Sequence, residues 1–318
     1  MNDQRSILER ARDWLFPPLP TEAAEAALAP EQLRRAVRRI EIRARRLLRD
    51  QLAGEYAAAF RGRGIEFAEL RPYAPGDEVR SIDWKATARL RQPVVRRYVE
   101  EREQTVLLLV DLSGSAGFAA SGPSVANRAI EIAGVLGFAA AAANDLVGAI
   151  AFANQINFSI PPAKGSQHVL RIVRDLLAQP VTGRTELARA FQHAGRLMRR
   201  RGVVIIISDF IAVHPDHSWE PSLSQLALRH DVVAICIRDA EESRLPAAPL
   251  ATWSGAERGD TVLADEATSA LQRQRLHEDR DRIADRLRRC GCDLIQLTTT
   301  DDYLPPLVRL FYERRQRP

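Results

Sequence analysis

The stretch from Thr105 to Ser115, TVLLLVDLSGS, constrains the fold of this chain more than any other. It begins with a run of β-branched residues and leucines, which is typical of a strand buried on both faces at the centre of a parallel sheet. Asp111, Ser113 and Ser115 then follow at alternate positions. Ligands of open α/β sheets bind outside the carboxyl ends of the strands, so we expect these side chains to converge there. Their oxygen atoms suit a hard cation such as Mg²⁺.

Two further segments supply oxygen ligands to the same region. VVIIISDF, from Val203 to Phe210, predicts a second buried strand that ends in Ser208 and Asp209, and GRTEL places Thr185 at the start of an amphipathic helix. An alternative stays open, because Asp, Ser and Gly after a strand are also what an ordinary βα turn and helix N-cap prefer.

The pattern D-x-S-x-S followed by a Thr and then an Asp resembles the metal-ion-dependent adhesion site of the von Willebrand factor A fold. The resemblance implies a Mg²⁺ (or Mn²⁺) ion bound directly by two serines and surrounded by the remaining residues, with one open position that a partner's carboxylate fills. The residues that match the pattern are Asp111, Ser113, Ser115, Thr185 and Asp209.

The length and composition of the chain are typical of a globular protein with one main domain and a smaller additional region. The chain has 318 residues, 46% of them hydrophobic, and a formal net charge of +5. Three cysteines are too few for a disulfide framework and favour a reducing compartment, and Cys290-Gly-Cys292 is expected at a helix end and strand start with inert thiols. We find no signal-peptide pattern, and the longest apolar run, residues 132–143, is short for a membrane span. A cytoplasmic protein without a membrane span is therefore expected.

Residues Glu31 to Leu52 predict an amphipathic helix whose polar face is rich in arginine. Such a face could bind the phosphates of nucleic acid or lipid headgroups. It could equally be a solvated or partner-facing helix side, and the absence of interleaved aromatic residues disfavours binding to nucleic acid.

Residues 62–103 combine β-branched, aromatic and charged residues and predict a small β-rich arm. The arm carries the pattern F-x-E-x-R-x-Y-x-P-G-D-x-x-R-x-I-D-W-x-x-x-A-R, which resembles the signature of the bacterial family called domain of unknown function 58, and the likeness extends over roughly residues 30–318. We expect Arg71, Arg80 and Arg89 to pair with Asp77 and Asp83, and Trp84 to anchor the arm on the body. Contact between the arm and a partner is the alternative.

Strands alternate with helices from residue 104 onward, which predicts a doubly wound α/β domain with a mostly parallel sheet. The expected organisation is an N-terminal helical region at 1–60, the arm at 61–103 and a von Willebrand factor A-like domain at 104–318. His214 and His217 are a weak zinc motif, since no further ligand accompanies them.

The family resemblance implies a non-enzymatic, chaperone-like protein that acts with a MoxR-type AAA+ ATPase, and a client protein whose acidic residue reaches the metal. One competing interpretation is a metal-dependent phosphohydrolase that uses Asp111 as nucleophile or Mg²⁺ as Lewis acid. Against it, Ser113 stands where a D-x-D hydrolase motif needs a second acid, and no G-x-S-x-G elbow or P-loop is present. The third interpretation is nucleic-acid or lipid binding by the arginine-rich helix.

Overall fold

A six-stranded sheet forms the centre of the computed structural model, which describes residues 30–48, 52–60, 66–99, 103–117, 122–211, 219–239, 251–254, 261–264 and 266–316. The strands lie in the order β10-β7-β6-β3-β4-β5, and β5 alone among these six is antiparallel to its neighbour. Their bounds are β3 Thr105–Asp111, β4 Leu146–Phe152, β5 Ile156–Ala163, β6 Val203–Ser208, β7 Asp231–Arg238 and β10 Asp293–Thr298. The predicted α/β class with a mostly parallel sheet is confirmed.

The strand order reverses between β3 and β6. If the six strands are numbered one to six by their order in the chain, they lie in the order 3-2-1-4-5-6 from the β5 edge. The connections that follow β3 and β6 therefore lie on opposite faces of the sheet. Such a reversal opens a crevice at the carboxyl ends of the two strands, which is where α/β proteins bind ligands. Asp111 and Asp209 lie on either side of it, since β3 ends at Asp111 and β6 ends one residue before Asp209.

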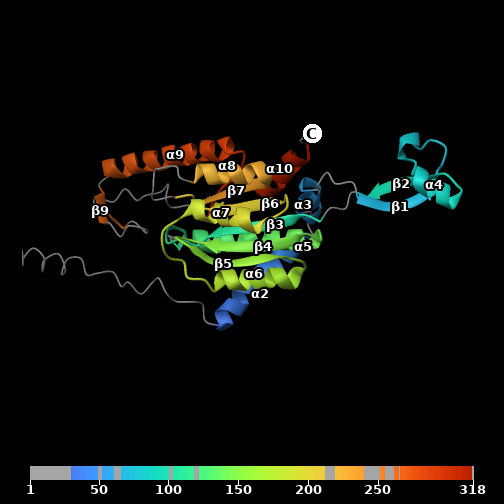
Figure 1. The fold of residues 1–318 in the computed structure, drawn as a ribbon. Helices are drawn as coiled ribbons and strands as arrows, with labels where there is room; N and C mark the ends of the chain where they lie inside the picture. Colours follow the sequence, from blue (N-terminus) through green and yellow to red (C-terminus); the bar gives the residue numbers. More distant parts are fainter. Residues whose placement is uncertain are drawn as a thin grey trace, which may run out of the picture.

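Helices cover both faces of the sheet (Figure 1). Successive residues of β3 alternate between two cores, with Val106 and Leu108 in one and Leu107 and Leu109 in the other. The first core contains α2 Pro30–Leu47, α3 Ala53–Ala59, α5 Val125–Ala142, α6 Ser166–Leu177 and α10 Leu304–Arg315, and the second contains α7 Leu187–Leu197, α8 Glu220–Arg229 and α9 Glu266–Arg289.

Helix α5 packs directly on the sheet and is itself covered by α2 and α6. Two glycines permit this close approach, because a Cβ atom on Gly134 would lie 2.5 Å from Ile40 Cγ2, and one on Gly137 would lie 3.0 Å from Val169 Cγ1. By length and composition, α5 is the one described helix that could cross a membrane, with a hydropathy of 1.4. Inside the protein 78% of this helix is buried, and the core helix of a globular protein has the same composition.

The N-terminal region contains two helices where the sequence predicted one from Glu31 to Leu52. Helix α2 ends at Leu47, and the separate helix α3 places Tyr56 in the core, where its hydroxyl donates a 3.1 Å hydrogen bond to Asp145 Oδ2. Tyr56 also packs edge-on against Phe311 of α10, with ring centroids 5.8 Å apart. Both helices thus share one core with the sheet. The division of the chain at residues 60 and 103 stays a prediction.

The arm is β-rich as predicted, with the antiparallel strands β1 Glu66–Pro72 and β2 Val94–Val99, and it stands away from the sheet in Figure 1. Two further elements, η3 Val79–Ser81 and the helix α4 Trp84–Leu90, lie between these strands. The expected role of Trp84 as an anchor is wrong, because Trp84 begins α4 and is 66% exposed.

The expected ion pairs within the arm are confirmed in part. Arg71 binds Asp77 through two hydrogen bonds of 2.5 and 2.8 Å. Arg80 and Arg89 make no ion pair in the part of the arm that the structure describes. Asp83 is the N-cap of α4 and accepts bonds of 3.0 Å from the backbone N–H groups of Lys85 and Ala86. Asp83 therefore caps a helix, whereas its sequence context predicted only an ion pair with arginine.

The C-terminal half of the chain contains a short antiparallel hairpin formed by β8 Ala251–Ser254 and β9 Thr261–Ala264. The cysteines are free and buried, and burial raises the pKa of Cys292 to about 12, which agrees with inert thiols. His214 and His217 lie outside the described residues.

The outer strand β5 departs from regular pairing. Its register against β4 shifts between Val147 and Ala149, opposite Pro161 and Pro162. Gly148 lies at this shift, where an added Cβ atom would meet the Pro162 ring and the Ile160 carbonyl at 3.0 Å. The two prolines and the glycine thus form a bulge in the outermost pair of strands.

Candidate metal centre

Asp111 is held by hydrogen bonds to both of its carboxylate oxygens. Its Oδ1 atom accepts a 2.9 Å bond from the backbone N–H of Ser113, and its Oδ2 atom accepts a 2.6 Å bond from the Ser208 hydroxyl. The first of these bonds is the contact between side chain and backbone that is expected in an ordinary turn from a strand to a helix. The second crosses from β3 to β6, and with 1% of its surface exposed Asp111 is fixed in the crevice between them.

Three hydroxyl groups lie together beside Asp111. The Ser113 and Ser115 hydroxyls are 3.1 Å apart, and the Thr185 hydroxyl donates a 2.9 Å bond to that of Ser113. The loops that carry them are joined by backbone bonds, since the Gly114 N–H donates to the Gly183 carbonyl at 2.8 Å. Gly183 has φ +85°, and an added Cβ atom would meet the Asn154 side chain at 2.9 Å, so a side chain there would disturb the loop that carries Thr185.

Asp209 carries the one carboxylate oxygen of this cluster that lacks a hydrogen-bond partner. Its Oδ1 atom accepts a 2.9 Å bond from the backbone N–H of Ile211, whereas Oδ2 has no such partner among the described residues. Only 1% of the residue's surface is exposed. The next residue, Phe210, has φ +54°, a conformation that bulky residues rarely adopt, and it donates its N–H to the Ser208 hydroxyl at 2.8 Å. The turn after β6 is therefore strained, as turns at functional sites often are.

Burial raises the pKa values of both acids, and repulsion by Asp209 raises that of Asp111 further. For Asp111, burial is the largest cause and the charge of Asp209 the second, and they raise the pKa to about 7 against hydrogen bonds from Ser208 and Ser113. Burial also raises the pKa of Asp209, while the Ile211 N–H, the Arg238 charge and the nearby Ser115 hydroxyl act in the opposite direction. Two acids in one desolvated pocket do not both ionise readily without a compensating cation.

The residues present fit a hard divalent cation. Two carboxylates and three hydroxyls form an all-oxygen donor set, the kind that Mg²⁺ and Mn²⁺ prefer, and the unpartnered Asp209 Oδ2 would gain a partner. No group of three or more His, Cys, Asp or Glu residues suited to a metal occurs in the described part of the chain. A centre at this position would therefore depend on hydroxyl ligands in addition to its two acids.

The structure brings together all five residues that the sequence singled out, and it adds two. Ser208 bonds to Asp111 across the crevice, and Arg238, at the end of β7, is 8% exposed and acts on Asp209 through its charge. Ser208 was visible in the sequence only as the last residue of a strand. Arg238 follows the apolar run of β7 just as Asp111 follows that of β3, which is the signal that could have identified it.

Comparison with known proteins places the chain in a family. The model of the family "Protein of unknown function DUF58" matches residues 69–284. Uncharacterized proteins of Mycobacterium tuberculosis and Mycobacterium bovis are each 31% identical over 295 residues, which covers 90% of this chain and 90% of each relative. An uncharacterized Mycobacterium avium protein is 31% identical over 171 residues, or 49% of this chain and 94% of the relative.

Two solved structures share a low level of similarity with the chain. BatB from Bacteroides thetaiotaomicron is 14% identical, with a TM-score of 0.42, and the match covers 67% of this chain and all of that one. The SpRpn10 VWA domain is 14% identical, with a TM-score of 0.34, and the match covers 65% of this chain and 94% of that one. Both TM-scores are below 0.5, so the fold assignment rests on the sheet of this chain.

Fold and site together define an α/β protein with an acid and hydroxyl cluster at the reversal of its sheet. On the family match and the mycobacterial relatives, the chain belongs to the DUF58 family.

Proposed function

We propose that this chain is a non-enzymatic protein-interaction module whose centre, formed by Asp111, Ser113, Ser115, Thr185 and Asp209, binds Mg²⁺ or Mn²⁺. The observation that carries the proposal is the unpartnered, buried Asp209 Oδ2 beside a second acid of raised pKa. A bound ion would balance this negative charge and offer a free coordination position to a carboxylate of another protein.

The protein's own groups prepare the site before a partner arrives. Ser208 and the Ser113 N–H fix the Asp111 carboxylate, so it cannot turn away from the cluster. The Thr185 hydroxyl holds that of Ser113, and the bond between Gly114 and Gly183 sets the spacing of their loops. Such preorganisation lowers the entropy lost when a ligand is ordered.

The geometry supports an interaction site over a phosphohydrolase. A nucleophilic carboxylate needs an oxygen free to attack, yet both oxygens of Asp111 accept hydrogen bonds and the residue is buried. Asp209 Oδ2 lacks a bond but is also buried, with 1% of the residue exposed. Neither acid is placed as a nucleophile would be.

A MoxR-type AAA+ ATPase is the partner that the family resemblance implies, with chaperone-like maturation or assembly of a client protein as the joint activity. We propose that an exposed Asp or Glu of the ATPase or the client supplies the external ligand. The exposed Trp84 adds a second contact surface at the arm, now that its role as an anchor is excluded.

The test is capture of the purified MoxR-type ATPase by this chain in Mg²⁺, in EDTA, and in EDTA followed by excess Mg²⁺. We expect capture to fall in EDTA, to return with Mg²⁺, and to be lost in Ser113→Ala/Ser115→Ala at an unchanged circular dichroism spectrum. Ser166→Ala, at the exposed start of α6, is the control. Equal capture with and without EDTA, together with no Mg²⁺ binding by calorimetry, would overturn the proposal.

A further inference from the structure

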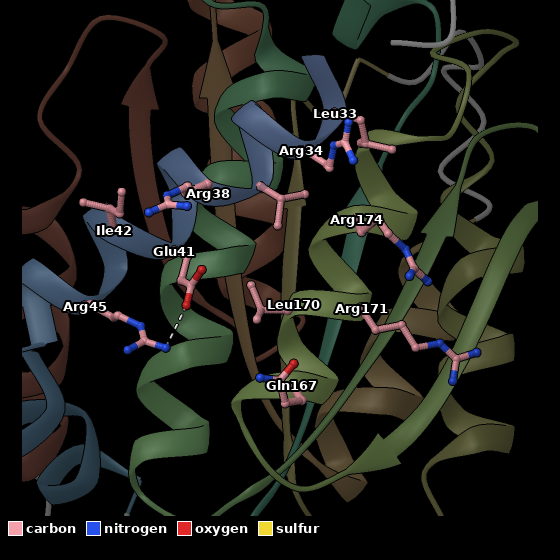
Figure 2. A pocket seen from close by; sticks show the side chains of 11 residues that line it. Leu33, Arg34, Arg38, Glu41, Ile42, Arg45, Gln167, Leu170, Arg171 and Arg174 are labelled. Atoms are coloured by element: carbon pink, nitrogen blue, oxygen red, sulfur yellow. Dashed lines mark ion pairs between the residues drawn. The ribbon is translucent and has the colours of Figure 1, made fainter. Parts of the chain in front are cut away.

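A groove of about 660 Å³ lies between α2 and α6, on the outside of the layer that covers the sheet (Figure 2). Its floor is apolar and contains Leu33, Val37 and Leu170, each partly buried against the core. Five of its lining residues are arginines, three from α2 and two from α6, and Glu41 is the one acid among the described lining residues. Figure 2 shows Leu170 between Arg45 of α2 and Arg171 of α6.

Arg45 of the groove forms a 2.7 Å ion pair with Glu41, and the other four arginines remain available to an external ligand. Arg38 makes no ion pair with any residue that the structure describes. Arg34 pairs with Glu31, and Arg171 and Arg174 both contact Asp175, but these arginine side chains are 56% to 77% exposed. Exposed pairs of this kind contribute about 0 to 1 kcal/mol and exchange readily for a better acceptor.

The groove is a built feature of the fold, because α2 is held firmly. Ile40 packs against Gly134 of α5 on its buried side, and Arg43 forms a 2.7 Å ion pair with Glu131 of the same helix. Helix α6 is fixed on α5 through Val169 and Gly137. The walls therefore stand in place before anything binds.

Shape and charge together select the occupant. The lining from Leu33 to Arg45 extends along α2 for about 18 Å at 1.5 Å per residue, which is about three turns of a second helix. A nucleic-acid backbone has no apolar face to cover the leucine floor, and a membrane surface does not enter a groove between two helices. An amphipathic helix with leucines on one side and acids along both flanks satisfies the floor and the walls at once.

We propose that the groove between α2 and α6 binds an acidic amphipathic helix of a partner protein, independently of the metal centre. Arginine suits this role better than lysine, since its planar guanidinium bonds to a carboxylate through two parallel hydrogen bonds. The groove would then be a contact site separate from the metal centre, because it binds a helix on the flank of the sheet whereas the metal centre binds a single carboxylate at the end of the sheet.

The test uses a fluorescein-labelled 18-residue peptide with leucines at helical positions i, i+4, i+7 and i+11 and glutamates on both flanks. We expect saturable binding by fluorescence anisotropy in EDTA, weakened at least tenfold by Arg38→Glu/Arg171→Glu. Arg39→Glu is the control for a single charge reversal outside the groove, because Arg39 is exposed on α2 but does not line the groove. Thermal melts check that each variant folds.

Further measurements distinguish recognition of a helix from non-specific electrostatic attraction. A scrambled peptide of the same composition should bind at least tenfold more weakly. Binding to duplex DNA and to vesicles with anionic phospholipid should be no weaker for Arg38→Glu/Arg171→Glu than for Arg39→Glu. Equal binding of the scrambled peptide, an equal effect of Arg39→Glu, or loss of DNA or vesicle binding with intact peptide binding would each overturn the proposal. Because EDTA is present in every one of these measurements, a negative result for the groove does not contradict the metal-dependent function.

Discussion

The hydroxyl of Ser208 donates a 2.6 Å hydrogen bond to Asp111 Oδ2 and thereby joins the ends of β3 and β6 across 97 residues of sequence. The same hydroxyl accepts the N–H of Phe210, so one side chain fixes both the acid of the first loop and the strained turn of the second.

Ser208→Ala should therefore weaken metal binding without removing a proposed ligand. The Ser208 hydrogen bond lowers the pKa of Asp111, so its loss should raise that pKa further and shift the pH at which Mg²⁺ binds to higher values. Calorimetric titration between pH 6 and 9 measures the shift. A pH profile identical to that of the wild type would mean that the bond does not act on Asp111.

Asp209→Asn should abolish measurable Mg²⁺ binding and at the same time stabilise the metal-free protein. The amide removes the buried charge that repels Asp111, while it is a poorer ligand than a carboxylate. We expect a higher Tm than wild type in EDTA and no increase on adding Mg²⁺. Asp279→Asn, on the exposed surface of α9, should match the wild type in both conditions.

The affinity for Mg²⁺ should fall as the pH drops below about 7, because the ion and a proton compete for Asp111, whose pKa is raised to about 7. We expect about a tenfold loss per pH unit in that range, provided one proton is displaced. Calorimetry in two buffers of different ionisation enthalpy would detect the released proton. A pH-independent affinity from pH 5 to 8 would contradict the prediction.

The same raised pKa predicts how the stability of the metal-free protein depends on pH. The folded-state value of about 7 exceeds the ordinary value of 3.8, so the stabilising contribution is complete below about pH 4 and is lost as the pH rises through 7. In EDTA, the site's contribution to Tm should fall from pH 5 to 8, and Mg²⁺ should raise Tm more at pH 8 than at pH 5. Asp209→Asn, measured in parallel, should flatten the EDTA profile.

Asp83→Ala should cost about 1 kcal/mol of unfolding free energy, the usual value of an N-cap, since its carboxylate receives two backbone N–H groups of α4. A loss above about 3 kcal/mol, typical of a broken buried ion pair, would instead favour the pairing expected from the sequence. Urea unfolding followed by tryptophan fluorescence measures it, with Asp281→Ala, at an exposed position of α9, as the control.

Gly134→Val should destabilise the protein by about 1 to 3 kcal/mol, because the new side chain must displace Ile40. Combining it with Ile40→Ala should give a smaller loss than the sum of the single losses, by about 1 kcal/mol or more. Gly195→Val is the control, since the nearest atom to its added Cβ is 3.8 Å away. An additive double mutant would mean that α2 does not rest on Gly134.

Long, strongly patterned elements were predictable, whereas features set by tertiary contacts were not. The apolar runs of β3 and β6 were recognisable in the sequence, and so were the polar residues that follow the two strands. Helix α3 is seven residues of mostly alanine, and its place depends on the bond between Tyr56 and Asp145, which are 89 residues apart. The contact between Ser208 and Asp111 likewise depends on the register of two strands far apart in sequence.

Exposure of Trp84 could not be read from the sequence either, because a tryptophan beside arginines suits a buried anchor and a contact surface equally well. Trp84 is 66% exposed, and the helix α4 that it begins lies on the arm away from the sheet (Figure 1), so the structure excludes the anchor.

The bulge in β5 limits how copies of this chain can aggregate. Edge strands invite another strand to pair with them, and this is a common route to insoluble assemblies. Pro161 and Pro162 lack the N–H groups that such pairing needs, and the shifted register beside them bends the edge. At this bulge the β5 side of the sheet is thus protected against strand addition, so copies of this chain cannot extend the sheet there.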